Sequence, residues 1–170
     1  MTSPKHNPGG NASVNIADEL QRALAALSGA FPQTVAVAAG EQRLDCALTS
    51  LDRLGCEFER LTLATPALAG ASLDRLQAIS ADLAARLTYL LEAIGPIEHD
   101  HEQCVVQMRS TPPQQGDDGA SYYELLVRRG GELALCRFRK PAGQPRQAIP
   151  AVVTREVLLR LAADLSAAVA

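Results

Sequence analysis

The sequence predicts an α+β domain in which helices pack on an antiparallel sheet. Apolar residues recur at helical spacing near the start, in the middle and at the end of the chain, and β-prone runs form two groups between them. Connections within each group are short, which favours antiparallel hairpins over parallel strands. The predicted order is one helix, three strands, a long helix, three or four strands and a last helix, or α-βββ-α-βββ(β)-α.

Composition sets the limits of this domain. The chain has 170 residues, 47% of them hydrophobic, so we predict one domain over residues 16–170. Residues 1–15 are polar and rich in proline and glycine, and are predicted to be a disordered tail. A net charge of −3 argues against a general nucleic-acid binder. The four cysteines lack C-x-x-C spacing and no apolar run is long enough to span a membrane, so we expect a cytoplasmic protein with reduced thiols.

The first helix and the first strand group occupy the N-terminal part of the domain. Apolar residues at helical spacing predict a helix from Ile16 to Ala30. The three strands are predicted over residues 34–38, 43–50 and 56–63. Phe58 and Leu61 would lie on opposite faces of the third strand, so we expect a β-bulge near Glu59 and Arg60.

A long helix separates the two strand groups. Ser72 is predicted to cap it, and apolar residues step by threes and fours from Leu73 to Ile94, where Gly95 and Pro96 would end it. Two strands are predicted over residues 97–101 and 104–109, followed by a loop over residues 110–120 and a hairpin. A Pro/Gly loop and a helix capped by Thr154 complete the chain.

The hairpin is the clearest strand signal. Gly130 and Gly131 lie between two β-prone runs and predict a tight two-residue turn. This turn would pair Leu125 with Cys136 and bury one face of the hairpin, made of Tyr123, Leu125, Val127, Ala134, Cys136 and Phe138. The other face would carry Tyr122, Glu124, Leu126, Arg128, Leu133, Leu135, Arg137 and Arg139.

Three leucines on this second face, Leu126, Leu133 and Leu135, suggest that a helix, a second subunit or a partner covers it. An apolar patch rimmed by arginines is typical of an interaction site, and a two-fold dimer would bury one patch against another. We therefore predict a homodimer, with a further protein as partner, and place both interactions at these leucines.

The same hairpin is also a candidate anion site. Residues 121–146 hold six basic residues against two acidic ones. An aromatic and arginine platform for an anion or a nucleic acid would consist of Arg109, Tyr122, Arg128, Arg137 and Arg139. The alternative is a solvated face with cross-strand pairs, for example Glu124 opposite Arg137.

His99, His101 and Cys104 form the one cluster with metal-ligand chemistry. On a strand the two histidines share a face and could hold one Zn²⁺, with Cys104 folding back across the turn. The alternative is a solvated turn, because no second ligand group occurs at recognisable spacing. No nucleophile with a base and an oxyanion donor can be named, so we expect no catalytic residue and no cofactor.

From Ile16 to Ala170, the order of elements resembles the class I type III secretion chaperones. The resemblance implies a dimeric, non-enzymatic protein that binds extended segments of other proteins along hydrophobic surface. The proline-containing tail, the turn at residues 98–103 and the basic hairpin depart from that family. The favoured hypothesis is a dimerising protein-binding module, the alternative is an anion- or nucleic-acid-binding domain, and a metal-dependent enzyme at His99 and His101 is third.

Overall fold

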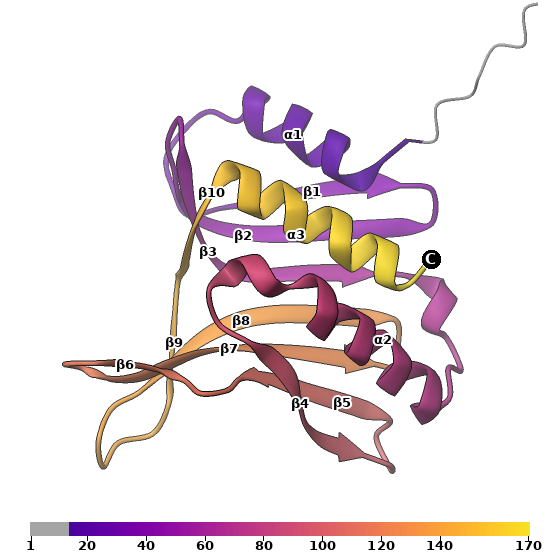
Figure 1. The fold of residues 1–170 in the computed structure, drawn as a ribbon. Helices are drawn as coiled ribbons and strands as arrows, with labels where there is room; N and C mark the ends of the chain where they lie inside the picture. Colours follow the sequence, from indigo (N-terminus) through magenta and orange to yellow (C-terminus); the bar gives the residue numbers. More distant parts are fainter. Residues whose placement is uncertain (1–13) are drawn as a thin grey trace, which may run out of the picture.

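The computed structural model describes residues 14–170 and contains one antiparallel sheet with three α-helices on one of its faces (Figure 1). The predicted α+β class is therefore confirmed. Most of the predicted tail, residues 1–13, lies outside the described residues, whereas Asn15 accepts a hydrogen bond from the Ala17 N–H and caps the first helix. Within residues 14–170, no helix has the length and apolar character needed to cross a membrane.

The sheet is built from two meanders. Side by side, its main strands are β1 (Gln33–Ala39), β2 (Gln42–Leu51), β3 (Gly55–Ala64), β8 (Glu132–Lys140), β7 (Gly119–Arg128), β5 (Val105–Ser110) and β4 (Ile94–Asp100). Within each meander, main strands that follow one another along the chain pair, and β3 pairs with β8 to join the two meanders. Three short strands lie at one end of the sheet: β6 (Gln114–Gly116) pairs with β7, β9 (Gln147–Ile149) with β8, and β10 (Ala151–Thr154) with β3.

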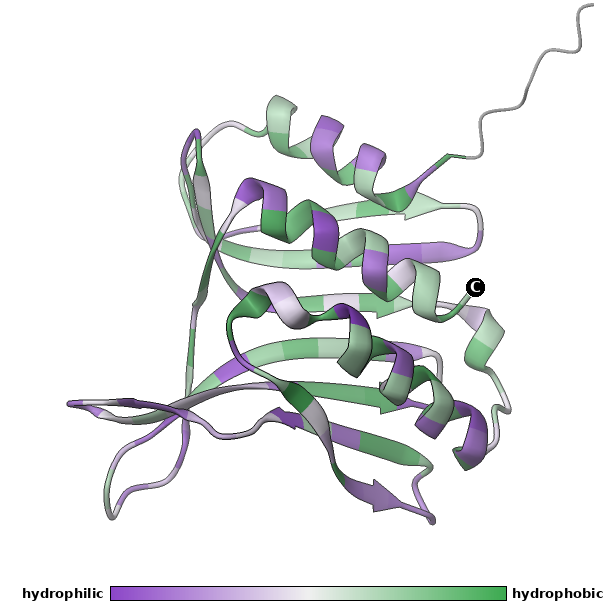
Figure 2. Ribbon diagram, in the orientation of Figure 1, coloured by the Kyte–Doolittle hydropathy of each residue, from purple (hydrophilic) through white to green (hydrophobic). Residues whose placement is uncertain are grey.

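The helices α1 (Ile16–Ala26), α2 (Leu73–Arg86) and α3 (Arg155–Ala168) cover the same face of the sheet (Figure 1). α1 packs on β1, α3 on β3, and α2 on β4, β5 and β7. Hydrophobic segments of the strands and helices meet in the layer between them, as the hydropathy colouring indicates (Figure 2). We call the opposite face, which no helix of the described residues covers, the helix-free face.

α2 begins where the sequence predicts and ends earlier. Ser72 Oγ accepts the Arg75 N–H at 3.2 Å, which confirms the predicted N-cap. The predicted end at Ile94 is wrong, because the helix stops at Arg86, a 3₁₀ turn η2 (Thr88–Leu90) follows, and Leu91 takes a left-handed conformation with φ of 62°. The apolar spacing continues past the end of α2 because the residues that follow are also buried, Leu90 as part of the 3₁₀ turn and Ile94 as part of β4.

The predicted bulge in β3 is confirmed. Leu48 of β2 pairs with Phe58 and Ala47 pairs with Arg60, so Glu59 has no partner in this ladder. The extra residue restores the alternation of the strand, and Phe58 and Leu61 are both fully buried under the helices.

The predicted register of the β7–β8 hairpin is wrong by one residue. Arg128 pairs with Glu132, so the loop has three residues instead of two. Gly131, with φ of 93°, accepts the Thr65 N–H at 2.7 Å, and a Cβ at this position would lie 2.2 Å from the Thr65 carbonyl oxygen. Contact between this loop and the end of β3 therefore fixes the turn, and it inverts the predicted faces of β8.

Candidate functional site

The predicted leucine patch does not exist in the fold. The changed register pairs Leu125 with Leu135 and Val127 with Leu133, and all four side chains are fully buried under the helices. Leu126 alone remains on the helix-free face, where it is half-buried. Leu133 and Leu135 are thus core residues and are not accessible to a partner. The homodimer and the protein partner stay predictions, but this patch no longer supports them.

The change of register also divides the predicted anion platform. Arg109, Tyr122 and Arg128 lie on the helix-free face, whereas Arg137 and Arg139 follow Leu135 on the helix-covered face. Phe138 and Cys136, which the sequence places in the core, lie half-buried on the helix-free face. The structure therefore contains two smaller groups of arginines instead of one surface.

On the helix-free face the arginines gather around Glu124. Its Oε2 atom accepts hydrogen bonds from Gln107 Nε2 at 2.7 Å, from Arg109 at 3.1 Å and from Arg146 at 2.6 Å. The carboxylate is only 5% exposed. Burial alone would raise the pKa of Glu124, but the bonds from Arg146, Gln107 and Arg109 outweigh it and hold the pKa below its ordinary value.

Arg128, the second arginine of the predicted platform on this face, is paired with a carboxylate. It donates to Glu132 at 2.8 Å, and Arg60 of β3 donates to the same carboxylate oxygen at 3.1 Å. Arg128 therefore agrees with the alternative interpretation, in which this face carries cross-strand ion pairs. The specific pair of Glu124 with Arg137 does not form, since Arg137 lies on the other face of β8.

The three predicted metal ligands do not converge. His99 lies on β4 and is exposed, and His101 is exposed in the following turn. Cys104 is buried and donates to the His101 carbonyl oxygen at 3.4 Å. Across residues 14–170, no group of three or more His, Cys, Asp or Glu side chains is arranged to hold a metal ion. The structure gives the zinc hypothesis no support.

A groove lies on the helix-covered face, where the sheet extends past the helices. Its volume is about 690 Å³, and it lies between the segment after η2 and the end of the sheet that carries β6 and β9. Proline marks both irregular strand ends that border it: Pro112 and Pro113 separate β5 from β6, and Pro150 separates β9 from β10. Figure 1 shows this end of the sheet projecting beyond the helices.

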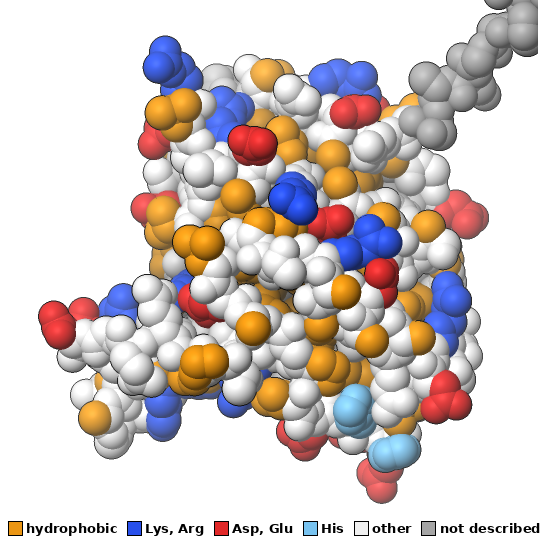
Figure 3. Space-filling model, viewed as in Figure 1, with side chains coloured by type: hydrophobic (Ala, Val, Ile, Leu, Met, Phe, Trp, Pro, Cys, Tyr) orange, Lys and Arg blue, Asp and Glu red, His pale blue; other side chains and the backbone are white. Residues whose placement is uncertain are grey.

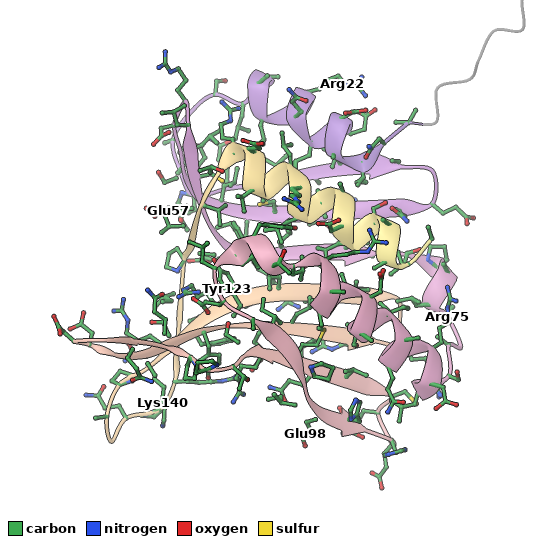
Figure 4. The ribbon with its side chains drawn as sticks, viewed as in Figure 1. Arg22, Glu57, Arg75, Glu98, Tyr123 and Lys140 are labelled. Atoms are coloured by element: carbon green, nitrogen blue, oxygen red, sulfur yellow. The ribbon has the colours of Figure 1, made fainter. Side chains whose placement is uncertain are left out.

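The floor of the groove holds a buried ion pair. Arg137 donates to Glu92 Oε1 at 2.7 Å, with side chains 11% and 10% exposed, and its guanidinium lies 4.4 Å from the centre of the Tyr123 ring. Tyr123 is labelled in Figure 4 and lines the groove with both charged residues. The second oxygen of Glu92, Oε2, is buried and accepts no hydrogen bond from the described residues. A buried carboxylate oxygen without a donor is costly, so Glu92 Oε2 retains an unused capacity to accept a hydrogen bond.

The rim of the groove is apolar and unusually exposed. Leu91 is 95% exposed and Val152 is 70% exposed, although each is a large hydrophobic side chain. Their neighbours along the groove are also apolar: Leu90, Ala93, Pro112, Pro113, Ile149 and Pro150. Figure 3, viewed from the helix side, shows hydrophobic side chains in orange on this face, also beside the projecting β6 arm. Such a rim around a polar floor has the composition of a binding site.

Sequence reasoning missed this groove. Glu92 falls inside the predicted long helix, where it gives no signal of its own, and the predicted two-residue turn places Arg137 on the opposite face. The strand-interrupting prolines were the available signal, because a proline removes a ladder N–H and is placed where a strand ends or bends.

Neither the sequence nor the fold of this chain matched a known protein family, a curated protein or a solved structure.

Proposed function

We propose that this chain is a non-enzymatic, chaperone-like module that binds an extended segment of another polypeptide in the groove beside η2. The observation that carries the proposal is the buried Glu92 Oε2, which has no donor in the described part of the chain and lies in a groove whose rim exposes Leu91 and Val152. An apolar side chain of the partner covers the rim, and a donor of the partner reaches Glu92.

The short strands around the groove favour a polypeptide as the ligand. Within the described part of the chain, β6, β9 and β10 each pair along one edge only. Gln114, Ile149 and Val152 of these strands line the groove. A strand edge with open N–H and C=O groups binds an extended backbone by adding a strand, while side-chain pockets select the sequence. This role is also the one that the resemblance in element order implies.

The donor that fits Glu92 best is a lysine or arginine of the partner. Glu92 already accepts a charge-assisted hydrogen bond from Arg137 at Oε1, and a cationic donor at Oε2 would form a second one. The expected segment is therefore β-prone and apolar, with one basic residue at its centre.

A labelled model peptide tests this proposal. Valine and threonine alternate in it around a central lysine, and a twin peptide carries norleucine in place of the lysine. Fluorescence anisotropy should show saturable binding, tighter for the lysine peptide. Leu91→Ser and Val152→Ser should each weaken binding, and Glu92→Gln should remove the preference for lysine.

Leu54 supplies the matched control. It is 72% exposed in the turn between β2 and β3 and does not line the groove. Leu54→Ser removes the same apolar side chain from the surface and should bind the peptide as the wild-type protein does. Equal weakening by Leu54→Ser and Leu91→Ser, or no saturable binding of either peptide, contradicts the proposal.

The predicted homodimer and cytoplasmic location belong to this proposal as well. All four cysteines are unbridged, which suits a reducing compartment. Sedimentation equilibrium at micromolar concentration tests the dimer, and Leu126→Glu tests whether the helix-free face takes part. A monomeric wild-type protein would contradict the dimer prediction and would not affect the proposal of peptide binding in the groove.

A further inference from the structure

A second hollow lies on the helix-free face, away from the groove. It measures about 450 Å³ and is lined by Gln107, Arg109, Tyr122, Lys140 and Arg146. These residues come from β5, β7, the end of β8 and the loop before β9. Lys140, labelled in Figure 4, lies where the projecting end of the sheet begins. Elements from distant parts of the chain thus bring three cations to one hollow.

Two guanidinium groups of the hollow are held in place. Glu124, buried beside it, accepts one hydrogen bond from Arg109 and one from Arg146. Arg109 also lies 4.6 Å from the centre of the Tyr122 ring, and Arg146 lies 4.1 Å from the centre of the Phe138 ring. A carboxylate and an aromatic face fix each guanidinium, so little conformational freedom remains to be lost when a ligand binds.

The charges of the hollow do not balance. Arg109, Arg146 and Lys140 carry three positive charges, and Glu124 supplies one negative charge, which leaves a surplus of two. Among the described residues, Lys140 donates to the Gln144 carbonyl oxygen and forms no ion pair. Arg109 Nε is buried and finds no acceptor in residues 14–170. A buried donor without a partner indicates a missing acceptor next to it.

We propose that this hollow binds a phosphate group, either inorganic phosphate or a small phosphomonoester. A phosphate dianion matches the surplus of two positive charges, and its oxygens can accept from both guanidinium groups and from Lys140 together. A carboxylate offers half the charge and two oxygens, so it fits this donor set less well.

The surroundings favour a small ligand over a nucleic acid. Toward β4 the adjacent hollow on this face is lined by Glu98 and Asp100, and Arg128 beside them is paired with Glu132. A polyanion that followed the sheet from the basic hollow would meet these carboxylates. The whole protein also carries a net charge of −3.

Isothermal titration calorimetry at low ionic strength tests the site. Inorganic phosphate and glycerol 3-phosphate are the probes, and acetate is the comparison. We expect one phosphate group per chain with a Kd below about 1 mM. Arg146→Ala and Lys140→Ala should each weaken binding about tenfold, since each removes a charge-assisted hydrogen bond. The probe that binds more tightly identifies the source, inorganic phosphate or an ester.

Two controls separate the site from net charge and from the groove. Arg75→Ala removes one positive charge from α2, on the opposite face of the sheet (Figure 4), and should bind phosphate as the wild-type protein does. Leu91→Ser, which alters the peptide groove, should also leave phosphate binding unchanged.

Several results would overturn the inference. They are a wild-type Kd above about 10 mM for both probes, equal losses in Arg75→Ala and Arg146→Ala, and acetate binding as tight as phosphate binding. If a single-stranded oligonucleotide binds more tightly than either probe, the ligand of the hollow is a nucleic acid and not a small phosphate compound. Lys140 is exposed, so Lys140→Ala keeps the test valid if Arg146→Ala unfolds.

Discussion

Arg137 of β8 and Glu92, which follows η2, form an ion pair of 2.7 Å between side chains that are both about nine-tenths buried. The pair joins the sheet to the segment that leads from the helix layer into β4. It therefore fixes the floor of the groove, and among residues 14–170 no donor reaches the second carboxylate oxygen, Glu92 Oε2.

The first prediction concerns this ion pair. Arg137→Leu should lower the free energy of unfolding by about 3 kcal/mol, because it leaves the Glu92 carboxylate buried without a counter-charge. The double variant Arg137→Leu/Glu92→Leu should recover most of the loss. Urea unfolding at pH 7, followed by circular dichroism, measures both, and a double variant no more stable than Arg137→Leu contradicts the prediction.

The second prediction concerns the β7–β8 turn. Gly131→Ala should destabilise the fold by about 1–3 kcal/mol, because alanine is strained at positive φ and its Cβ would overlap the Thr65 carbonyl. Gly130→Ala is the matched control, since among residues 14–170 no heavy atom beyond its chain neighbours lies within 4 Å of a Cβ there. Its unfolding free energy should stay within about 0.5 kcal/mol of the wild-type value. Equal losses at the two glycines would show that the Thr65 contact does not determine the turn.

The third prediction compares two phenylalanines. Phe58 is fully buried between the sheet and the helices, so Phe58→Ala should cost about 3–5 kcal/mol of stability. Phe138 is half-buried on the helix-free face beneath Arg146, and Phe138→Ala should cost about 1 kcal/mol. Chemical denaturation of both variants tests the corrected register. A larger loss of stability for Phe138→Ala than for Phe58→Ala would instead support the two-residue turn.

The fourth prediction concerns pH and Glu124. The folded-state pKa of Glu124 lies below its ordinary value of 4.5, so the ionised carboxylate stabilises the fold above that pH, and this contribution is lost as pH falls through the folded-state pKa. Glu124→Gln should be less stable than the wild-type protein at pH 7. The difference should shrink at pH 3. Urea midpoints at pH 7, 5 and 3 test this, and a difference that does not change with pH rules it out.

Local signals were sufficient for much of the fold. Ser72 and Thr154 cap α2 and α3 because their hydroxyls accept N–H groups three residues later, which depends on neighbouring residues alone. The bulge at Glu59 could be predicted because apolar residues change parity within a single strand. β6, β9 and β10 were missed because each is short and adjoins a proline or glycine.

Tertiary contacts decided what the sequence alone did not. Two adjacent glycines suit a turn of two residues or of three, and the contact of Gly131 with Thr65 selects the longer one. The one additional loop residue places Leu133 and Leu135 on the helix-covered face of β8. It places Cys136 and Phe138 on the helix-free face. The predicted leucine patch and anion platform both depended on this choice. Within the anion platform, Arg109 and Tyr122 remain together, because β5 and β7 lie side by side.

The pairing of β3 with β8 has a consequence for the folding pathway. Within each meander, neighbouring strands of the main sheet are close in sequence, so their loops close at small entropic cost. The β3–β8 pairing, with Leu61 opposite Leu135, instead closes a loop that contains α2 and most of the second meander. We therefore expect each meander to form early from local contacts, and the docking of one meander against the other at β3 and β8 to be the slow step of folding.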